Sequence, residues 1–111
     1  MQLNVDKLLL DVVSACEDML AFHEGITFDA FLQDKMLQLA TERQFEIIGE
    51  AIARLSRIDD VRLQKNIPEY RNIIGFRNVI AHGYDVIDQA VLWDFAAHKV
   101  PDLLVRVKSY N

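Results

Sequence analysis

Helix-breaking residues are scarce in this chain. Its 111 residues include only four Gly and two Pro, and it lacks the alternating runs rich in Val, Ile and Thr that are typical of β-strands. Apolar residues instead recur every three or four positions, which places them on one face of an α-helix. The length is that of one ordinary domain. We therefore predict that residues 1–111 form a single all-α domain, an up-and-down bundle of four to five helices.

The helices of the first half are predicted from this spacing and from capping residues. A first apolar stripe ends near residues 23–25, and Thr27 can cap a short turn after it. Asp34 can cap the longest helix, residues 35–56, and residues 57–66 then break the period and are expected to be a connection. The long helix is expected to place Leu37, Ala40, Phe45, Ile47, Ile48, Ala51, Ile52 and Leu55 on one arc and Glu42, Glu46, Gly49 and Glu50 on the other.

The second half contains two or three further helices. A third helix over residues 68–82 begins with a proline, which suits the first helical position, and is followed by Gly83 as its terminator. Asp88 can cap a fourth helix through Lys99. Pro101 either kinks that helix or starts a short fifth one.

Charge and composition limit the classes of function. There are 12 Lys and Arg against 17 Asp and Glu, a net charge of −5, which argues against a protein that coats DNA by neutralising phosphates. No apolar run approaches the roughly 18–20 residues of a membrane span, and charges from Asp6 onward interrupt the apolar core that a signal peptide requires. We expect a cytoplasmic protein with no membrane contact.

The single cysteine is expected to be structural. Cys16 lies inside the first apolar stripe, and no basic residue flanks it that would lower the pKa of its thiol. One cysteine cannot form a disulfide within the chain, and no Cys/His group has the spacing of zinc ligands. We predict a buried Cys16 and expect neither a metal nor a cofactor.

An arginine lies on the apolar side of the third helix. Arg77 falls within an arc that otherwise contains Tyr70, Ile73, Ile74, Ile80 and Ala81. Burying a guanidinium without partners is costly, so Arg77 must meet an acidic residue, a second subunit or an anionic ligand. Glu46 and Glu50 are available for a purely structural ion pair.

The other side of this helix is a polar strip, formed by Arg71, Gly75, Asn78 and His82. A glycine inside a helix costs about 0.5–1 kcal/mol relative to Ala, and the usual reason for it is the close approach of another backbone, here a packing helix or a bound polyanion. His82 lies in the last turn, where the negative end of the helix dipole favours the imidazolium. His82 is either a general acid or only a helix cap.

The octapeptide RNVIAHGY, residues 77–84, contains an Arg followed by four residues and a His. It resembles the Arg-x4-His signature of HEPN domains, and the Tyr two residues after the His resembles the HepT toxin branch of that family. ERQFEIIGEAIARLS at 42–56, IPEYRNIIGFRNVIAHGYDVID at 67–88, Trp93 and the Pro-Asp-Leu at 101–103 are similar to the HepT helices in order and spacing. The resemblance therefore covers nearly the whole chain.

This resemblance implies an RNA-cleaving toxin of a type VII toxin–antitoxin system that acts without a metal. The implied homodimer brings two copies of the motif into one cleft, so that two His82 side chains supply both the base and the acid that the reaction needs. Arg77 then stabilises the pentavalent phosphate through a bidentate contact, and Asn78 orients the phosphate or its neighbours. Arg71 from each subunit adds positive charge to the cleft.

The resemblance also assigns a modification to Tyr84. In the HepT family the matching Tyr receives adenylyl groups from a partner nucleotidyltransferase, the MntA antitoxin, which uses ATP. Phosphates added beside Arg77 and His82 would occupy the anion site and exclude RNA. Alternatively, Tyr84 only packs the turn onto the next helix.

Two other readings of the sequence remain. Glu46 and Glu50 could be half of a di-metal site, but the Glu-x-x-His motifs that such a site needs on neighbouring helices are missing. The chain could also be a non-catalytic HEPN subunit that binds a nucleotidyltransferase partner, including as its neutralising subunit. His23 and His98 are expected to be surface or cap residues, and Trp93 is expected in the core.

Overall fold

The computed structural model of the protein describes residues 2–82 and 87–111. Helices make up most of this part of the chain, and no strand occurs in it, so the predicted all-α class is confirmed. The helices are α1 (Gln2–His23), α2 (Phe28–Leu32), α3 (Lys35–Ile58), α4 (Asp60–Asn66), α5 (Tyr70–His82), α6 (Gln89–Asp94) and α7 (Val100–Lys108), with a π-helical turn, η1 (Phe95–Lys99), between the last two.

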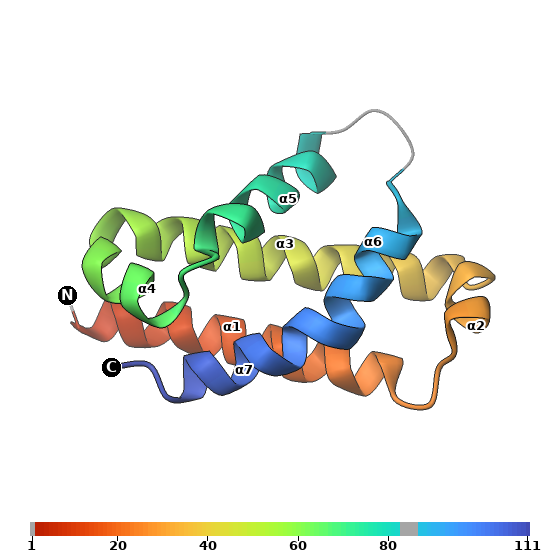
Figure 1. The fold of residues 1–111 in the computed structure, drawn as a ribbon, viewed down its shortest axis with the longest axis horizontal. Coiled ribbons are helices and arrows are strands. Elements are labelled where there is room, and N and C mark those ends of the chain that lie inside the picture. Colours follow the sequence, from red (N-terminus) through yellow and green to blue (C-terminus); the bar gives the residue numbers. More distant parts are fainter. Residues whose placement is uncertain (1, 83–86) are drawn as a thin grey trace.

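The long helices alternate in direction. Figure 1 shows α1 and α3 running antiparallel, α5 rising away along α3, and the arm made of α6, η1 and α7 returning toward the amino-terminal end of α1. α1 packs against both α3 and α7, whereas α5 packs mainly on α3. No helix in the described ranges is long and apolar enough to cross a membrane.

Three predicted helix caps are present. The Thr27 hydroxyl accepts a hydrogen bond from the Ala30 backbone N–H at 3.1 Å, and Asp34 accepts one from Leu37 at 3.0 Å. Asp88 caps α6 in the same way, with the Ala90 N–H at 2.9 Å. Each cap satisfies a backbone donor that has no partner inside its helix, so these short polar residues fix where α2, α3 and α6 begin.

One core joins the helices. Its largest fully buried side chains include Met19, Phe31, Phe45, Ile48, Ile52, Leu55, Leu63, Ile67 and Leu92. Cys16 is completely buried within this core, as predicted. Burial raises the pKa of the Cys16 thiol to about 12, and the neighbouring Glu17 adds to the shift, so the thiol is protonated and unreactive at neutral pH.

Two predicted boundaries are wrong. Residues 57–66 are not an irregular connection, because α3 continues to Ile58 and residues 60–66 form α4. Leu63 and Ile67, four residues apart, are both completely buried, and this pair of contacts holds the short helix against the core. The next helix, α5, begins at Tyr70 instead of Pro68, which lies in the turn before it.

The apolar arc of α3 is also narrower than predicted. Leu37, Ala40 and Ile47 are only partly buried, whereas Gln38 and Thr41 are buried. Gln38 can be buried because its side-chain amide donates to the backbone carbonyls of Phe31 and Leu32, at 2.9 and 3.2 Å. The polar residue thus fastens α2 to α3.

Of the two positions expected for His23, surface or helix end, the structure shows the second: His23 is the last residue of α1 but is not exposed. It is half-buried, with its Nε2 atom 2.9 Å from the hydroxyl of Thr41 and its ring centroid 5.3 Å from those of Phe31 and Trp93. Trp93 packs against the core, as expected. His98 is exposed, 3.9 Å from Asp94.

The π-helical turn explains how Pro101 is accommodated. The Val100 N–H donates to the Phe95 carbonyl five residues earlier, and Pro101 follows in the first turn of α7. Proline has no N–H, and in a regular α-helix its ring would clash with the carbonyl four residues before it. The wider turn separates these groups, so the arm continues through the proline.

Candidate functional site

Helix α5 carries the motif residues, and its packing decides where they point. Its buried residues are Tyr70, Ile73 and Ile80. Phe76 adds an edge contact to Phe45 of α3, with ring centroids 4.7 Å apart. These contacts turn the neighbouring Arg77 toward α3, which confirms that the arginine lies on the inward side of the helix.

Arg77 lies directly on Gly49 of α3. A side chain on Gly49 would collide with Cβ and Cγ of Arg77. Gly49 is buried, so its predicted position on the polar arc is wrong. The signal was present in the sequence: a glycine inside a long helix has an energetic cost, and close approach of another chain segment is the usual reason for it.

Both terminal nitrogens of the Arg77 guanidinium have a partner. Its Nη2 lies 3.0 Å from Glu50 Oε2, and its Nη1 donates to Asn78 Oδ1 at 3.1 Å. Nε is buried and has no hydrogen-bond partner among the described residues. The side chain of Arg77 is 25% exposed. Of the two glutamates that the sequence offers as ion-pair partners, Glu50 is therefore the one that Arg77 contacts.

Glu50 is shared between two cations. Arg54, one turn later on α3, donates from Nε to Glu50 Oε1 at 3.2 Å. Glu46, one turn earlier, instead lies 4.0 Å from Arg43. These residues line a shallow hollow of about 260 Å³ between α1 and α3, with Arg77 at its edge. Within the part of the chain that the structure describes, no three His, Cys, Asp or Glu side chains are grouped so that they could hold a metal ion.

The predicted polar strip of α5 is open to solvent where it is described. Arg71, Gly75 and Asn78 are all exposed. Apart from its chain neighbours and the backbone of its own helix, no atom of the described chain lies within 4 Å of where a Gly75 side chain would begin, so the close approach expected there is not made inside this chain. The Arg71 guanidinium lies 5.1 Å from the centre of the Tyr70 ring.

Part of the predicted site lies outside the described residues. His82 is the last residue of α5, but its side chain is not described. Gly83, the predicted terminator, and Tyr84, the predicted modification site, also lie outside. The structure therefore brings Arg77 and Asn78 together, leaves Arg71 two turns away on the same helix, and does not place the His82 imidazole or the Tyr84 phenol.

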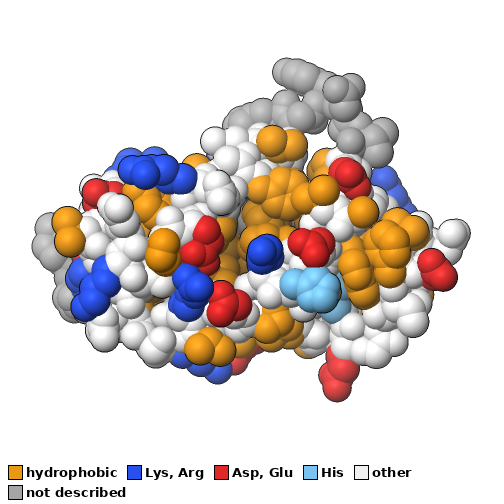
Figure 2. All heavy atoms as spheres, viewed as in Figure 1, with side chains coloured by type: hydrophobic (Ala, Val, Ile, Leu, Met, Phe, Trp, Pro, Cys, Tyr) orange, Lys and Arg blue, Asp and Glu red, His pale blue; other side chains and the backbone are white. Residues whose placement is uncertain are grey.

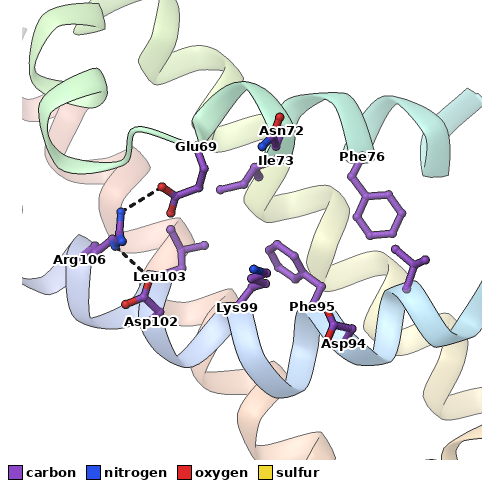
Figure 3. A pocket seen from close by; sticks show the side chains of 11 residues that line it. Glu69, Asn72, Ile73, Phe76, Asp94, Phe95, Lys99, Asp102, Leu103 and Arg106 are labelled. Atoms are coloured by element: carbon purple, nitrogen blue, oxygen red, sulfur yellow. Dashed lines mark hydrogen bonds and ion pairs between the residues drawn. The ribbon is translucent and has the colours of Figure 1, made fainter.

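A larger cavity of about 480 Å³ lies between α5 and the α6–α7 arm. Figure 2 shows apolar side chains gathered between these two elements. The lining of the cavity is mixed: five residues are apolar, and the other six are polar or charged, namely Ile73, Phe76, Val91, Phe95 and Leu103, and Glu69, Asn72, Asp94, Lys99, Asp102 and Arg106. At one end Arg106 bridges two acidic residues, Glu69 at 3.0 Å and Asp102 at 2.9 Å (Figure 3). The cavity does not include Arg77.

Comparison with known proteins identifies the family. Residues 12–110 match the model of a family described as "Ribonuclease HepT-like". "Probable ribonuclease HepT" of Thermococcus cleftensis is 37% identical over 95 residues, which cover 86% of this chain and 84% of that protein. "Putative RNase MJ1380" of Methanocaldococcus jannaschii is 31% identical over 105 residues, 95% of this chain and 94% of its own length. No solved structure matches at a significant level. The chain belongs to the HepT-like ribonuclease family.

Proposed function

We propose that this protein is a metal-independent endoribonuclease toxin of a type VII toxin–antitoxin system. The observation that carries the proposal is the position of Arg77 in a chain of the HepT-like ribonuclease family: a partly exposed guanidinium held on a glycine, on the helix whose last residue is His82. Arg77 and His82 are the proposed catalytic residues, with Asn78 and Arg71 as supporting groups.

The chemistry needs few parts. The 2′-hydroxyl of RNA attacks the adjacent phosphorus, its proton passes to a base, the bond from phosphorus to the 5′-oxygen breaks, and an acid protonates that leaving oxygen. The products are a 2′,3′-cyclic phosphate and a 5′-hydroxyl. Arg77 stabilises the charge that develops on the phosphorane, because a guanidinium can contact two phosphate oxygens at once.

One His82 cannot be both base and acid in the same turnover. We therefore propose a homodimer in which each subunit supplies one His82 to a shared cleft. The exposed strip of α5 supports this arrangement, since Gly75 has free space above it and would allow a second molecule to approach the helix closely. In such a cleft Arg71 of each subunit adds positive charge to an otherwise acidic protein.

Regulation is proposed to act through Tyr84. A nucleotidyltransferase antitoxin of the MntA type would transfer adenylyl groups from ATP to the phenol oxygen, with release of pyrophosphate. The added phosphates would lie two residues from His82 and compete with RNA for the same cations. Labelled nucleotide should therefore transfer to the wild-type chain and not to Tyr84→Phe, and transfer to the variant would exclude this residue.

The decisive experiment is cleavage of end-labelled RNA in the presence of EDTA. The wild-type chain, produced without a partner and confirmed unmodified by intact mass, is compared with His82→Ala. We expect a 2′,3′-cyclic phosphate product from the wild type and at least a hundredfold slower cleavage by the variant. Cleavage that stops in EDTA would contradict metal independence, and an active His82→Ala would remove His82 from the reaction.

Two observations favour a second candidate, a non-catalytic subunit that binds a nucleotidyltransferase. Arg77 already has an acidic partner in Glu50, as a structural arginine would. The cavity beside α5 has the size of a binding site and combines apolar side chains with charged ones at its rim. This candidate predicts that the unmodified wild type leaves RNA intact, does not arrest growth when expressed alone, and still forms a complex with its partner.

A further inference from the structure

We infer that Glu50 is a positioning residue, which orients the Arg77 guanidinium for contact with a phosphate. The inference rests on the proposed ribonuclease function and extends it to a residue outside the Arg-x4-His motif. It depends on two neighbouring residues of α3: Gly49 packs against Cβ and Cγ of Arg77, and Glu50 contacts the guanidinium.

The first step is the packing of the arginine stem. Cβ and Cγ of Arg77 occupy the space where any side chain at Gly49 would lie. The stem therefore touches the α3 backbone and has little freedom to change rotamer. What remains free to move is the outer part of the side chain, beyond Cγ. An acceptor placed near the guanidinium then determines the orientation of its plane.

Glu50 and Asn78 contact the two terminal nitrogens of the guanidinium. Glu50 Oε2 lies 3.0 Å from Nη2 as an ion pair, and Asn78 Oδ1 accepts a hydrogen bond from Nη1 at 3.1 Å. A guanidinium has five N–H donors, and the hydrogen bond to Asn78 uses one of them, while Nε is buried without a partner in the described chain. The terminal nitrogens therefore retain donors for a ligand, and neighbouring N–H groups of a guanidinium can bind two phosphate oxygens at once.

Charge is the obvious objection, because a carboxylate near the site would repel phosphate. Glu50 is paired with Arg54 as well as Arg77, so the three side chains together carry one net positive charge. The Glu50 side chain is also 37% exposed, and solvent screens its field. The carboxylate is thus offset by two cations while it holds the arginine in place.

The test compares three variants in the full-length protein. Glu50→Ala removes the acceptor, Glu50→Gln keeps an acceptor oxygen without the charge, and Glu46→Ala is the matched control one turn earlier on α3. We expect Glu50→Ala to lower kcat for RNA cleavage by about tenfold or more with a smaller change in KM, because misorientation affects the transition state most. Glu50→Gln should recover most of that loss, and Glu46→Ala should match the wild type.

A second measurement does not depend on cleavage. Side-chain ¹⁵N NMR of Arg77 should show slowed rotation of the terminal nitrogens in the wild type and in Glu46→Ala, and fast rotation in Glu50→Ala. A wild type that leaves RNA intact but shows slowed rotation would refute the proposed function while supporting the positioning of Arg77. Equal or faster cleavage by a folded Glu50→Ala would overturn the inference, and so would fast rotation in the wild type.

Discussion

His23 and Arg77 both pack a polar side chain against α3, but their surroundings differ. His23 reaches α3 from α1 and contacts Thr41, while Arg77 reaches it from α5 and contacts Glu50. Each has one buried nitrogen without a hydrogen-bond partner among the described residues, Nδ1 in His23 and Nε in Arg77. The surroundings differ, since aromatic rings enclose the histidine whereas the arginine borders an exposed strip.

The hydrogen bonds determine the state of His23. The Thr41 hydroxyl donates its one proton to the Leu37 carbonyl at 2.7 Å, so it can only accept from His23, and the imidazole must carry its proton on Nε2. Nδ1 then faces a region with no described partner, and protonating it would place a charge beside Phe31 and Trp93. Burial accordingly lowers the pKa of His23 below its ordinary value of 6.5.

The comparison shows how to separate a structural polar group from a functional candidate. His23 is neutral, and its surroundings within the chain satisfy Nε2 and leave only the lone pair of Nδ1 without a hydrogen bond. Arg77 has N–H donors without a partner in the described chain, among them Nε, and it lies next to a surface where no other helix contacts Gly75. A buried polar residue is therefore a better candidate when it also borders an open surface.

The largest expected effect comes from the glycine under Arg77. Gly49→Ala should destabilise the protein by about 1–3 kcal/mol, because the added methyl group meets Arg77 Cβ and Cγ, atoms that can move only if α5 shifts from α3. Urea unfolding of the variant measures the loss. Gly75→Ala is the matched control on open surface, and it should be neutral or more stable by about 0.5–1 kcal/mol. Equal effects of the two substitutions would contradict the described packing.

A bulkier change tests whether the strip of α5 meets a second copy. Gly75→Leu should not lower the stability of the isolated chain and should raise it by up to about 0.5–1 kcal/mol, because Leu is the better helix former and no other part of the described chain lies near that position. In the proposed dimer the same side chain would block close approach, so the dissociation constant should rise by about tenfold, or roughly 1.4 kcal/mol. Sedimentation velocity over a concentration series measures it. Unchanged association would place the dimer interface elsewhere.

The smallest expected effect concerns pH and His23. Because the pKa of His23 is lower in the folded than in the unfolded state, the unfolded chain takes up a proton first as pH falls. The stability associated with His23 is therefore complete above about pH 6.5 and declines below it. The stability difference between wild type and His23→Gln should shrink from pH 8 to pH 5.5 in urea unfolding. A difference that stays constant would show that His23 is not held neutral.

The sequence predicted features that depend on local chemistry. Thr27, Asp34 and Asp88 cap helices as expected because a short polar side chain bonds to its own backbone neighbours. The inward position of Arg77 follows from the helical period of α5 alone. The helical periods leave both Glu46 and Glu50 open as its partner, because the choice between them depends on how α3 and α5 cross.

The errors involve contacts between distant segments. α4 is held by two buried apolar residues, Leu63 within it and Ile67 directly after it, too few to produce a visible period. Gly49 falls on the polar side of the α3 helical wheel. The wheel contains no information on α5, whose Arg77 covers this glycine. His23 lies at a helix end, where a surface position is the usual expectation, and only the meeting of α1, α2, α3 and α6 encloses it.

The π-helical turn near the carboxyl terminus also determines which side of the α6–α7 arm its buried residues occupy. The buried residues Leu92, Ala96 and Val100 are spaced by four, which is longer than the 3.6 residues of an α-helical turn, so in a regular helix they would drift around its axis. A turn with more residues absorbs this excess and keeps all three on the same side. Leu103 and Val107 then continue that side along α7. The one additional residue in the π-helical turn thus lets the buried side chains of α6 and of α7 face the same core.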